Sequence, residues 1–198
     1  GRVLFRSIEK DNKDLRKEIV RDYVASRVKN PREGCVVLAR TNLEVQSLNR
    51  MIREELKTNK LVQESTEAVA TVHVQKKNEK RSFAIGDRIV FLRNNSTLGV
   101  KNGLMGEVTG LKKDARGEAR ILTIRDERKN KIEVDLFSYN RIGHAYAVTI
   151  HKSQGSTIDR VFVQASPTMD KESSYVAMSR QKLEAKLYVS LEDFGPEK

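Results

Sequence analysis

The chain has 198 residues, of which 38% are hydrophobic and 33% are charged, and its formal net charge is +11. A chain of this length forms one large or two small domains, and its polar composition excludes a membrane span, which needs about 20 consecutive apolar residues. The positive charge favours nucleic acid as a partner over a membrane surface, and solvated Lys and Arg side chains on an ordinary basic protein explain it equally well.

Cys35 is the single cysteine, and it lies in the apolar run Cys35–Ala39. It has no partner for an internal disulfide, so we expect a buried, reduced thiol and a cytoplasmic protein. The first residues, Gly1 to Arg6, lack the apolar core of a signal peptide. Because no Met begins the chain, we also expect it to be a segment of a longer protein.

The first part of the chain alternates helix and strand. Apolar residues recur at helical spacing over residues 12–29, which predicts an amphipathic helix that ends before Pro31. Residues 35–39 predict a buried strand. Thr41 and Glu44 then form the S/T-x-x-E pattern of a capping box, which predicts a second helix. This order of elements indicates an α/β layer.

Short apolar segments separated by turn residues follow. They occupy residues 69–74, 83–92, 106–111, 119–124 and 131–136. Short strands at this spacing, with Asn and Gly at the bends, predict a small antiparallel barrel. From about residue 146 the α/β pattern returns. The sequence therefore predicts one α/β domain that is interrupted by a β-rich insertion.

The segment from Thr149, with the sequence TIHKSQGSTI, follows an apolar run. Thr149 and His151 offer hydrogen bonds to phosphate or base, and Lys152 supplies positive charge to a nucleic-acid backbone. Gln154 and Gly155 bring an amide and an unobstructed peptide near a nucleotide. Each residue alone fits an ordinary polar loop. The complete string after an apolar strand indicates a functional loop.

Two arginines extend this pattern. Arg180 ends the short helical stretch YVAMSR, which begins at Tyr175. Taken alone, an arginine at a helix end is usually a partner of the helix dipole or a solvated charge. Arg40 follows the predicted strand 35–39 and precedes the capped helix, where a plain strand-end charge is also an adequate explanation.

Several sites are missing from the sequence. No Gly-Lys pair occurs, so the chain has no Walker A loop. Residues 121–127 imitate a Walker B strand, but a turn and an alternating segment follow, so we interpret them as half of a hairpin. The histidines at 73, 144 and 151 do not form a metal set with the one cysteine, so we predict no metal site. We expect His73 on a strand face and His144 in an ordered loop.

The insertion contains a second group of residues that are suited to binding nucleic acid. Asn95, Lys101 and Asn102 would gather amides and a positive charge on adjacent loops. Such a surface is suited to guiding a single strand. Ordinary hairpin turn chemistry explains the same residues equally well, because Asn and Gly tolerate left-handed backbone conformations.

Residues 149–158 and 175–180 together resemble motifs V and VI of superfamily-one helicases. The segments 81–92, 98–106 and 134–180 look like conjugal transfer relaxase-helicases of the TraA type, which are similar to the RecD-like branch. The resemblance implies a second RecA-like domain of the P-loop NTPase type, with an inserted SH3-like antiparallel β-barrel. The implied division is 1–75 and 142–198 for the RecA-like domain and 76–141 for the barrel.

The resemblance also implies an ATP-dependent 5′-to-3′ translocase on single-stranded DNA. Arg180 would be the arginine finger at the γ-phosphate, which contributes roughly 10³–10⁵ in rate. Gln154, Gly155 and Arg40 would contact the nucleotide. ATP and Mg²⁺ would be bound mainly by a first RecA-like domain that this chain lacks, so the fragment alone should not hydrolyse ATP.

On the DNA side, the resemblance assigns contacts to Thr149 and His151. The positive charge of Lys152 predicts a further contact with the DNA backbone. Ser156 and Thr157 stand where relatives often carry an acidic residue, which puts a ribose contact there in question. The implied partners are single-stranded DNA, the missing RecA-like domain and other relaxosome proteins. The alternatives are a non-catalytic nucleic-acid or protein-binding module derived from a helicase domain, and a barrel that serves as a docking site for conjugation partners.

Overall fold

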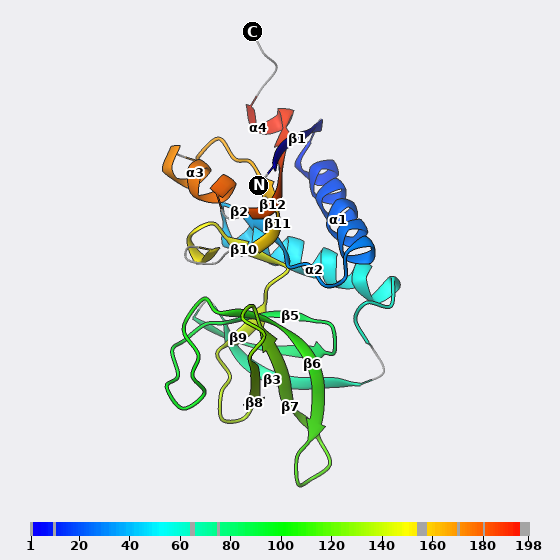
Figure 1. The fold of residues 1–198 in the computed structure, drawn as a ribbon, viewed down its shortest axis with the longest axis vertical. Helices are drawn as coiled ribbons and strands as arrows, with labels where there is room; N and C mark the ends of the chain where they lie inside the picture. The colour runs from blue at the N-terminus through cyan, green and yellow to red at the C-terminus, as the bar shows by residue number, and fades with distance from the viewer. Residues whose placement is uncertain are drawn as a thin grey trace. The chain divides into compact units, whose positions relative to one another are not determined.

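The computed structural model describes residues 2–9, 11–63, 66–74, 76–153, 158–169, 171–179 and 181–194 (Figure 1). The chain divides into two compact units. Unit 1 comprises Gly1–Glu55 and Tyr146–Lys198, and unit 2 comprises Leu56–Ala145. Unit 2 thus interrupts unit 1 in sequence. The predicted division at 76 and 141 into RecA-like and SH3-like parts stays a prediction.

Unit 1 is built on a parallel sheet. Its elements are β1 (Arg2–Glu9), α1 (Asn12–Lys29), β2 (Cys35–Ala39), α2 (Asn42–Thr58), whose last residues belong to unit 2, β10 (Ala147–Thr149), the 3₁₀ turn η1 (His151–Ser153), β11 (Ile158–Gln164), α3 (Lys171–Ser179), β12 (Gln181–Ser190) and α4 (Leu191–Phe194). The strand order is β1-β12-β11-β2-β10, and every pair is parallel. The predicted α/β class is confirmed by this sheet.

Helices cover both faces of this sheet. The chain crosses from β1 to β2 in one direction and from β11 to β12 in the other, so right-handed connections place α1 and α3 on opposite faces (Figure 1). α1 buries Leu15, Ile19 and Tyr23 completely, and the Tyr23 ring lies 5.8 Å from that of Phe162 in β11. The predicted helix at 12–29 and the buried thiol of Cys35, which forms no disulfide, are both confirmed.

The sequence did not predict β1. Charged residues at positions 2, 6 and 9 interrupt its apolar residues. Its partner is β12, from Arg2 opposite Glu184 to Glu9 opposite Ser190, at the other end of the chain. A strand that is defined by so distant a partner leaves little local signal.

Unit 2 consists of antiparallel strands. They are β3 (Glu67–Val74), β4 (Lys77–Ala84), β5 (Arg88–Phe91), β6 (Met105–Lys113), β7 (Ala119–Asp126), β8 (Lys131–Asp135) and β9 (Ile142–His144). β3 and β4 form a hairpin, and the others form a sheet in the order β8-β7-β6-β5-β9. The buried residues of one hydrophobic cluster come from both sheets, among them Val72, Phe83, Phe91 and Ile124. The predicted SH3-like barrel itself stays a prediction.

The single strand predicted at 83–92 is wrong. A turn at Gly86 separates β4 from β5, because this glycine has a φ of +96°. Its amide donates to the Val108 carbonyl at 2.8 Å. The polar first half of β4 and the short β9 were not predicted, since neither has an apolar pattern.

The hairpin interpretation of residues 121–127 is confirmed. β7 pairs with β8 in antiparallel register. Asp126 Oδ1 accepts hydrogen bonds from the amides of Arg128 and Asn130, at 2.9 and 2.7 Å. The carboxylate that imitated a Walker B residue therefore shapes the turn.

None of the helices in the described residues has the length and apolar character that a bilayer crossing requires.

Candidate nucleotide and nucleic-acid site

The carboxyl edge of the unit 1 sheet gathers several predicted residues. Thr149, the last residue of β10, pairs with Ala39, the last residue of β2. The Ile150 amide also donates to the Ala39 carbonyl at 3.3 Å. Arg40 and η1 therefore leave the sheet from neighbouring strand ends. In open parallel sheets, ligands bind outside the carboxyl ends of the strands.

The turn after β10 is closed by its own hydroxyl groups. Thr149 Oγ1 accepts the Lys152 amide at 3.4 Å. Ser153 is completely buried, and its Oγ donates to the Ile150 carbonyl at 2.6 Å. His151 is exposed at this turn. The hydroxyls of the motif thus set the turn geometry, and the imidazole is directed to solvent.

Lys152 lies half-buried on the same turn. Burial lowers its pKa from the usual value, because the ammonium loses hydration. In the described part of the chain no carboxylate forms an ion pair with it. A phosphate bound at this edge would supply the missing negative charge.

Arg40 is held at the end of β2. Its Nε donates to the Thr168 carbonyl at 3.4 Å, in the segment that follows β11. The predicted capping box is confirmed, since Thr41 Oγ1 accepts the Glu44 amide at 3.3 Å and the Thr41 amide donates to Glu44 Oε2 at 2.8 Å. Glu44 Oε1 also accepts from Gln164 at 3.2 Å, which ties α2 to the end of β11.

Gln154, Gly155 and Arg180 lie outside the described residues. The strands that follow them are described. Ile158 begins β11 and Gln181 begins β12, and the two residues pair with each other. The chain therefore enters two adjacent strands directly after the segments that carry these predicted residues.

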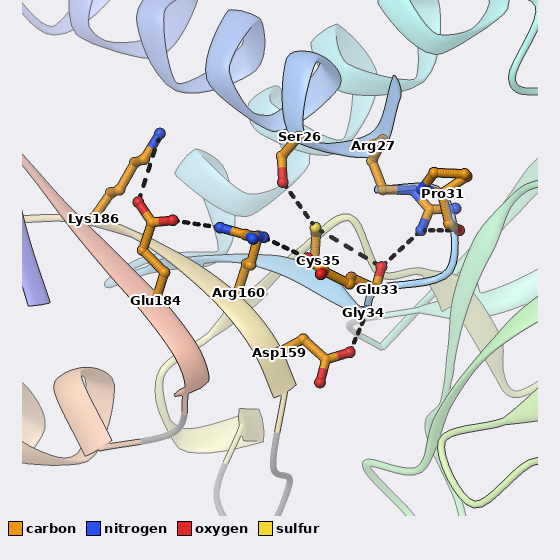
Figure 2. A network of polar contacts seen from close by, with 10 residues as sticks. All are labelled: Ser26, Arg27, Pro31, Glu33, Gly34, Cys35, Asp159, Arg160, Glu184 and Lys186. Atoms are coloured by element: carbon orange, nitrogen blue, oxygen red, sulfur yellow. Dashed lines mark hydrogen bonds and ion pairs between the residues drawn. The ribbon is translucent and has the colours of Figure 1, made fainter. Parts of the chain in front are cut away.

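A polar network surrounds these strand starts (Figure 2). Asp159 Oδ2 accepts the amide of Gly34, just before β2, at 2.7 Å. Arg160 bonds to Glu33 on one side and to Glu184 of β12 on the other. Sequence reasoning did not identify this network, because its members are scattered charges that come together only across neighbouring strands.

In unit 2, the asparagines of the loop after β5 shape the loop itself. Asn95 Oδ1 accepts the Leu98 amide at 2.9 Å. Asn94 Oδ1 accepts the Asn102 amide at 2.7 Å. Lys101 and Asn102 are exposed. The turn role of Asn95 is visible in the structure, and a DNA contact by Asn95, Lys101 or Asn102 stays a prediction.

Unit 2 is also the more basic unit. Residues 56–145 contain 18 Lys and Arg and 11 Asp and Glu, a net charge of +7 out of the chain's +11. The positive charge is therefore concentrated in the insertion, which occupies less than half of the sequence.

Two histidines have local structural partners. His73 Nδ1 lies 2.8 Å from Asn78 Oδ1 across the β3–β4 hairpin. His144 Nε2 lies 3.1 Å from the Ser82 carbonyl and 3.6 Å from Asp87 Oδ2. Within the described ranges, no three His, Cys, Asp or Glu side chains are grouped as metal ligands.

Known sequences resemble this chain over most of its length. It is 36% identical over 184 residues to the probable conjugal transfer protein TraA of Sinorhizobium fredii, which covers 92% of the chain and 16% of that protein. It is 38% identical over 164 residues to the conjugal transfer protein TraA of Agrobacterium fabrum, covering 81% and 14%. The ATP-dependent DNA helicase Pif1 of Bdellovibrio bacteriovorus is 31% identical over 117 residues, covering 52% and 25%. The chain thus spans less than a fifth of the TraA proteins that it matches.

Solved structures show the same relationship in the fold. A Pif1 helicase from Bacteroides, in complex with ADP-AlF3 and ssDNA, superposes with a TM-score of 0.56 at 18% identity, covering 96% of this chain and 52% of that one. Pif1 from Candida albicans gives 0.55 at 15% identity, covering 89% and 53%. Residues 144–188 match the UvrD-like helicase C-terminal domain family. The predicted resemblance to TraA is therefore confirmed: this chain is a relative of the TraA conjugal transfer proteins, and it is also similar in sequence to Pif1 helicases.

Proposed function

We propose that the chain is the second motor domain of an ATP-dependent helicase or translocase that acts on single-stranded DNA during conjugative transfer. The observation that carries the proposal is the pairing of Thr149 with Ala39, the residue before Arg40, at the carboxyl edge of a parallel sheet in a chain related to TraA. The 5′-to-3′ direction is proposed from the resemblance to the RecD-like branch. A cytoplasmic location fits this role.

The nucleotide would lie between this domain and a first RecA-like domain of the same protein. ATP and Mg²⁺ would be held mainly by that first domain. Arg180 would stabilise the charge that develops on the γ-phosphate, with Gln154, Gly155 and Arg40 as further contacts. Tight positioning and charge stabilisation are what phosphoryl transfer requires from a protein. The pairing of Ile158 with Gln181 supports a shared position for Arg180 and the segment 154–157, because they directly precede those two residues in the sequence.

The DNA strand would pass the carboxyl edge of unit 1. Thr149, His151 and Lys152 offer a hydroxyl, an exposed imidazole and a half-buried ammonium there. Unit 2, which we propose to be an SH3-like barrel, would add electrostatic attraction through its net charge of +7 and contacts from Lys101, Asn102 and Asn95.

DNA-stimulated ATP turnover by the full-length protein tests the proposal. We expect Arg180→Ala to abolish turnover, while single-strand binding, measured by fluorescence anisotropy, is largely kept. Unchanged turnover in this variant would eliminate the finger assignment. Binding of DNA without any ATP turnover by the wild-type protein would favour the alternative, a non-catalytic binding module derived from a helicase domain.

A further inference from the structure

The side chain of Arg160 connects three adjacent strands of the unit 1 sheet. Its Nε donates to Glu33 Oε2 at 2.5 Å, just before β2 begins, and its Nη1 bonds to Glu184 Oε2 on β12. Figure 2 shows the guanidinium between these two carboxylates. Because β11 lies between β2 and β12, one arginine joins the starts of all three strands.

The contact is partly shielded from water. The side chains of Arg160, Glu33 and Glu184 are only 23%, 29% and 19% exposed. The hydrogen bond to Glu33 is the main cause that raises the pKa of Arg160. Charge-assisted hydrogen bonds of this kind are roughly twice as strong as neutral ones and fix the orientation of the guanidinium.

Backbone contacts reinforce the same position. The Arg160 amide donates to the Gly34 carbonyl at 3.0 Å, and the Gly34 amide donates to Asp159 Oδ2 at 2.7 Å. The start of β11 is therefore fixed to the start of β2 by side chains and backbone together.

A β-bulge lies on the other side of β11, where this strand pairs with β12. Ile158 pairs with Gln181, but the next pair is Arg160 with Glu184, so β12 contains one extra residue between them. A bulge changes the direction of the strand and of the residues next to it. The Arg160–Glu184 ion pair sits just beyond this bulge.

The network continues into α1. Lys186 Nζ lies 3.9 Å from Glu184 Oε1 and 3.5 Å from Asp22 Oδ2. Asp22 Oδ2 also accepts the Tyr188 hydroxyl at 2.8 Å. The carboxylate of Glu184 is thereby linked to a helix that packs on the sheet.

We propose that Arg160 is a positioning residue for nucleotide hydrolysis. By bonding to Glu33 and Glu184, it holds the starts of β11 and β12 in register, and the segment 154–157 and Arg180 directly precede those starts in the sequence. This inference rests on the proposed function, in which those residues face the nucleotide. A misplacement of about 1 Å at a catalytic group costs up to about 100-fold in rate.

The test compares variants of the full-length protein in DNA-stimulated ATP turnover. Arg160→Met keeps the aliphatic stem and removes both ion pairs. We expect it to lower kcat about 10-fold to 100-fold, with KM for ATP and single-strand affinity changed much less. Arg160→Lys should recover part of the loss. Arg50→Met is the matched control, because Arg50 is exposed on α2, outside this network, and we expect the kcat of this variant to equal that of the wild type.

A second comparison separates positioning from a purely structural role. Circular dichroism shows at which temperatures the Arg160→Met protein is fully folded, and a positioning role predicts that the loss of kcat persists there. A wild-type kcat in folded Arg160→Met would overturn the inference. If Arg160→Met unfolds at the assay temperature, Glu184→Gln and Arg160→Lys replace it in the comparison. A wild-type kcat in both of these variants would also overturn the inference. Unchanged turnover in Arg180→Ala instead counts against the finger assignment in the proposed function.

Discussion

The side-chain amide of Asn49 in α2 makes both hydrogen bonds to the backbone of Ala147 in β10. Its Nδ2 donates to the Ala147 carbonyl at 3.0 Å, and the Ala147 amide donates to its Oδ1 at 2.8 Å. β10 lies at the edge of the sheet, so these backbone groups point away from β2. Asn49 thus takes the place of a further strand, next to the residues that lead into Thr149.

Replacing Asn49 by Ala should destabilise unit 1. The substitution leaves the amide and the carbonyl of Ala147 without protein partners, which costs about 1–3 kcal/mol. Chemical denaturation followed by circular dichroism measures the free energy of unfolding. Arg50→Ala, at the neighbouring exposed position on α2, is the control and should change stability by less than about 0.5 kcal/mol. Equal stability of the two variants would contradict the strand-replacement role.

Lys152→Met should stabilise the fold and weaken DNA binding together. The half-buried ammonium is disfavoured in the folded state, as its lowered pKa indicates, and Met removes that cost. The same change removes one positive charge from the proposed DNA contact. We therefore expect the slope of log affinity against log salt concentration to fall by about 0.7 for a single strand. Lys29→Met, at an exposed position on α1, should leave the slope unchanged.

The pH dependence of the Lys152 effect has a definite sign. Between the lowered folded pKa and the ordinary value of 10.5, the unfolded chain binds more protons at this lysine than the folded chain does. The free energy of unfolding therefore rises with pH across that window. The stability advantage of Lys152→Met is full below the folded pKa and shrinks as pH rises through it. Denaturation at several pH values should show the two proteins converging under alkaline conditions, and a constant difference would refute the assignment.

Gly86→Ala should be among the most destabilising single changes in unit 2. A Cβ at this position would lie 2.2 Å from the carbonyl oxygen of Leu61, and the φ of +96° disfavours any L side chain. We expect a loss of about 3 kcal/mol or more, from the clash added to the backbone strain. Gly117 also has a positive φ, of +81°, but no atom lies within 4 Å of the point that a Cβ would occupy there, so Gly117→Ala isolates the strain alone. It should cost about 1–2 kcal/mol.

Replacement of residues 60–144 by a flexible Gly-Ser linker of about 15 residues should leave unit 1 folded. The parallel sheet draws all of its strands from outside this segment, and α1 packs on it. Far-UV circular dichroism and a cooperative thermal transition measure the outcome. Loss of all helical signal would show that unit 1 depends on unit 2 for its stability.

Local sequence patterns were sufficient to predict most helices and strands of this chain. The periodicity of residues 12–29, the apolar run at 35–39 and the capping box at Thr41 each reflect an interaction within one helix or one strand. The strings at 149–158 and 175–180, together with the segments 81–92, 98–106 and 134–180, were sufficient for the family resemblance, because the identity of their residues, and not their placement, carries that signal.

The arrangement of the site depended on contacts between distant segments. Only the sheet order puts Thr149 beside Ala39, and Ile158 beside Gln181. The partners of Arg160 and of Asn49, and the strand β1, could not be identified from neighbouring residues, since each is defined by a strand far away in the sequence. Hydrophobic spacing and turn chemistry thus determined the elements and their kind, whereas parallel pairing, which joins segments with no sequence proximity, decided which side chains meet.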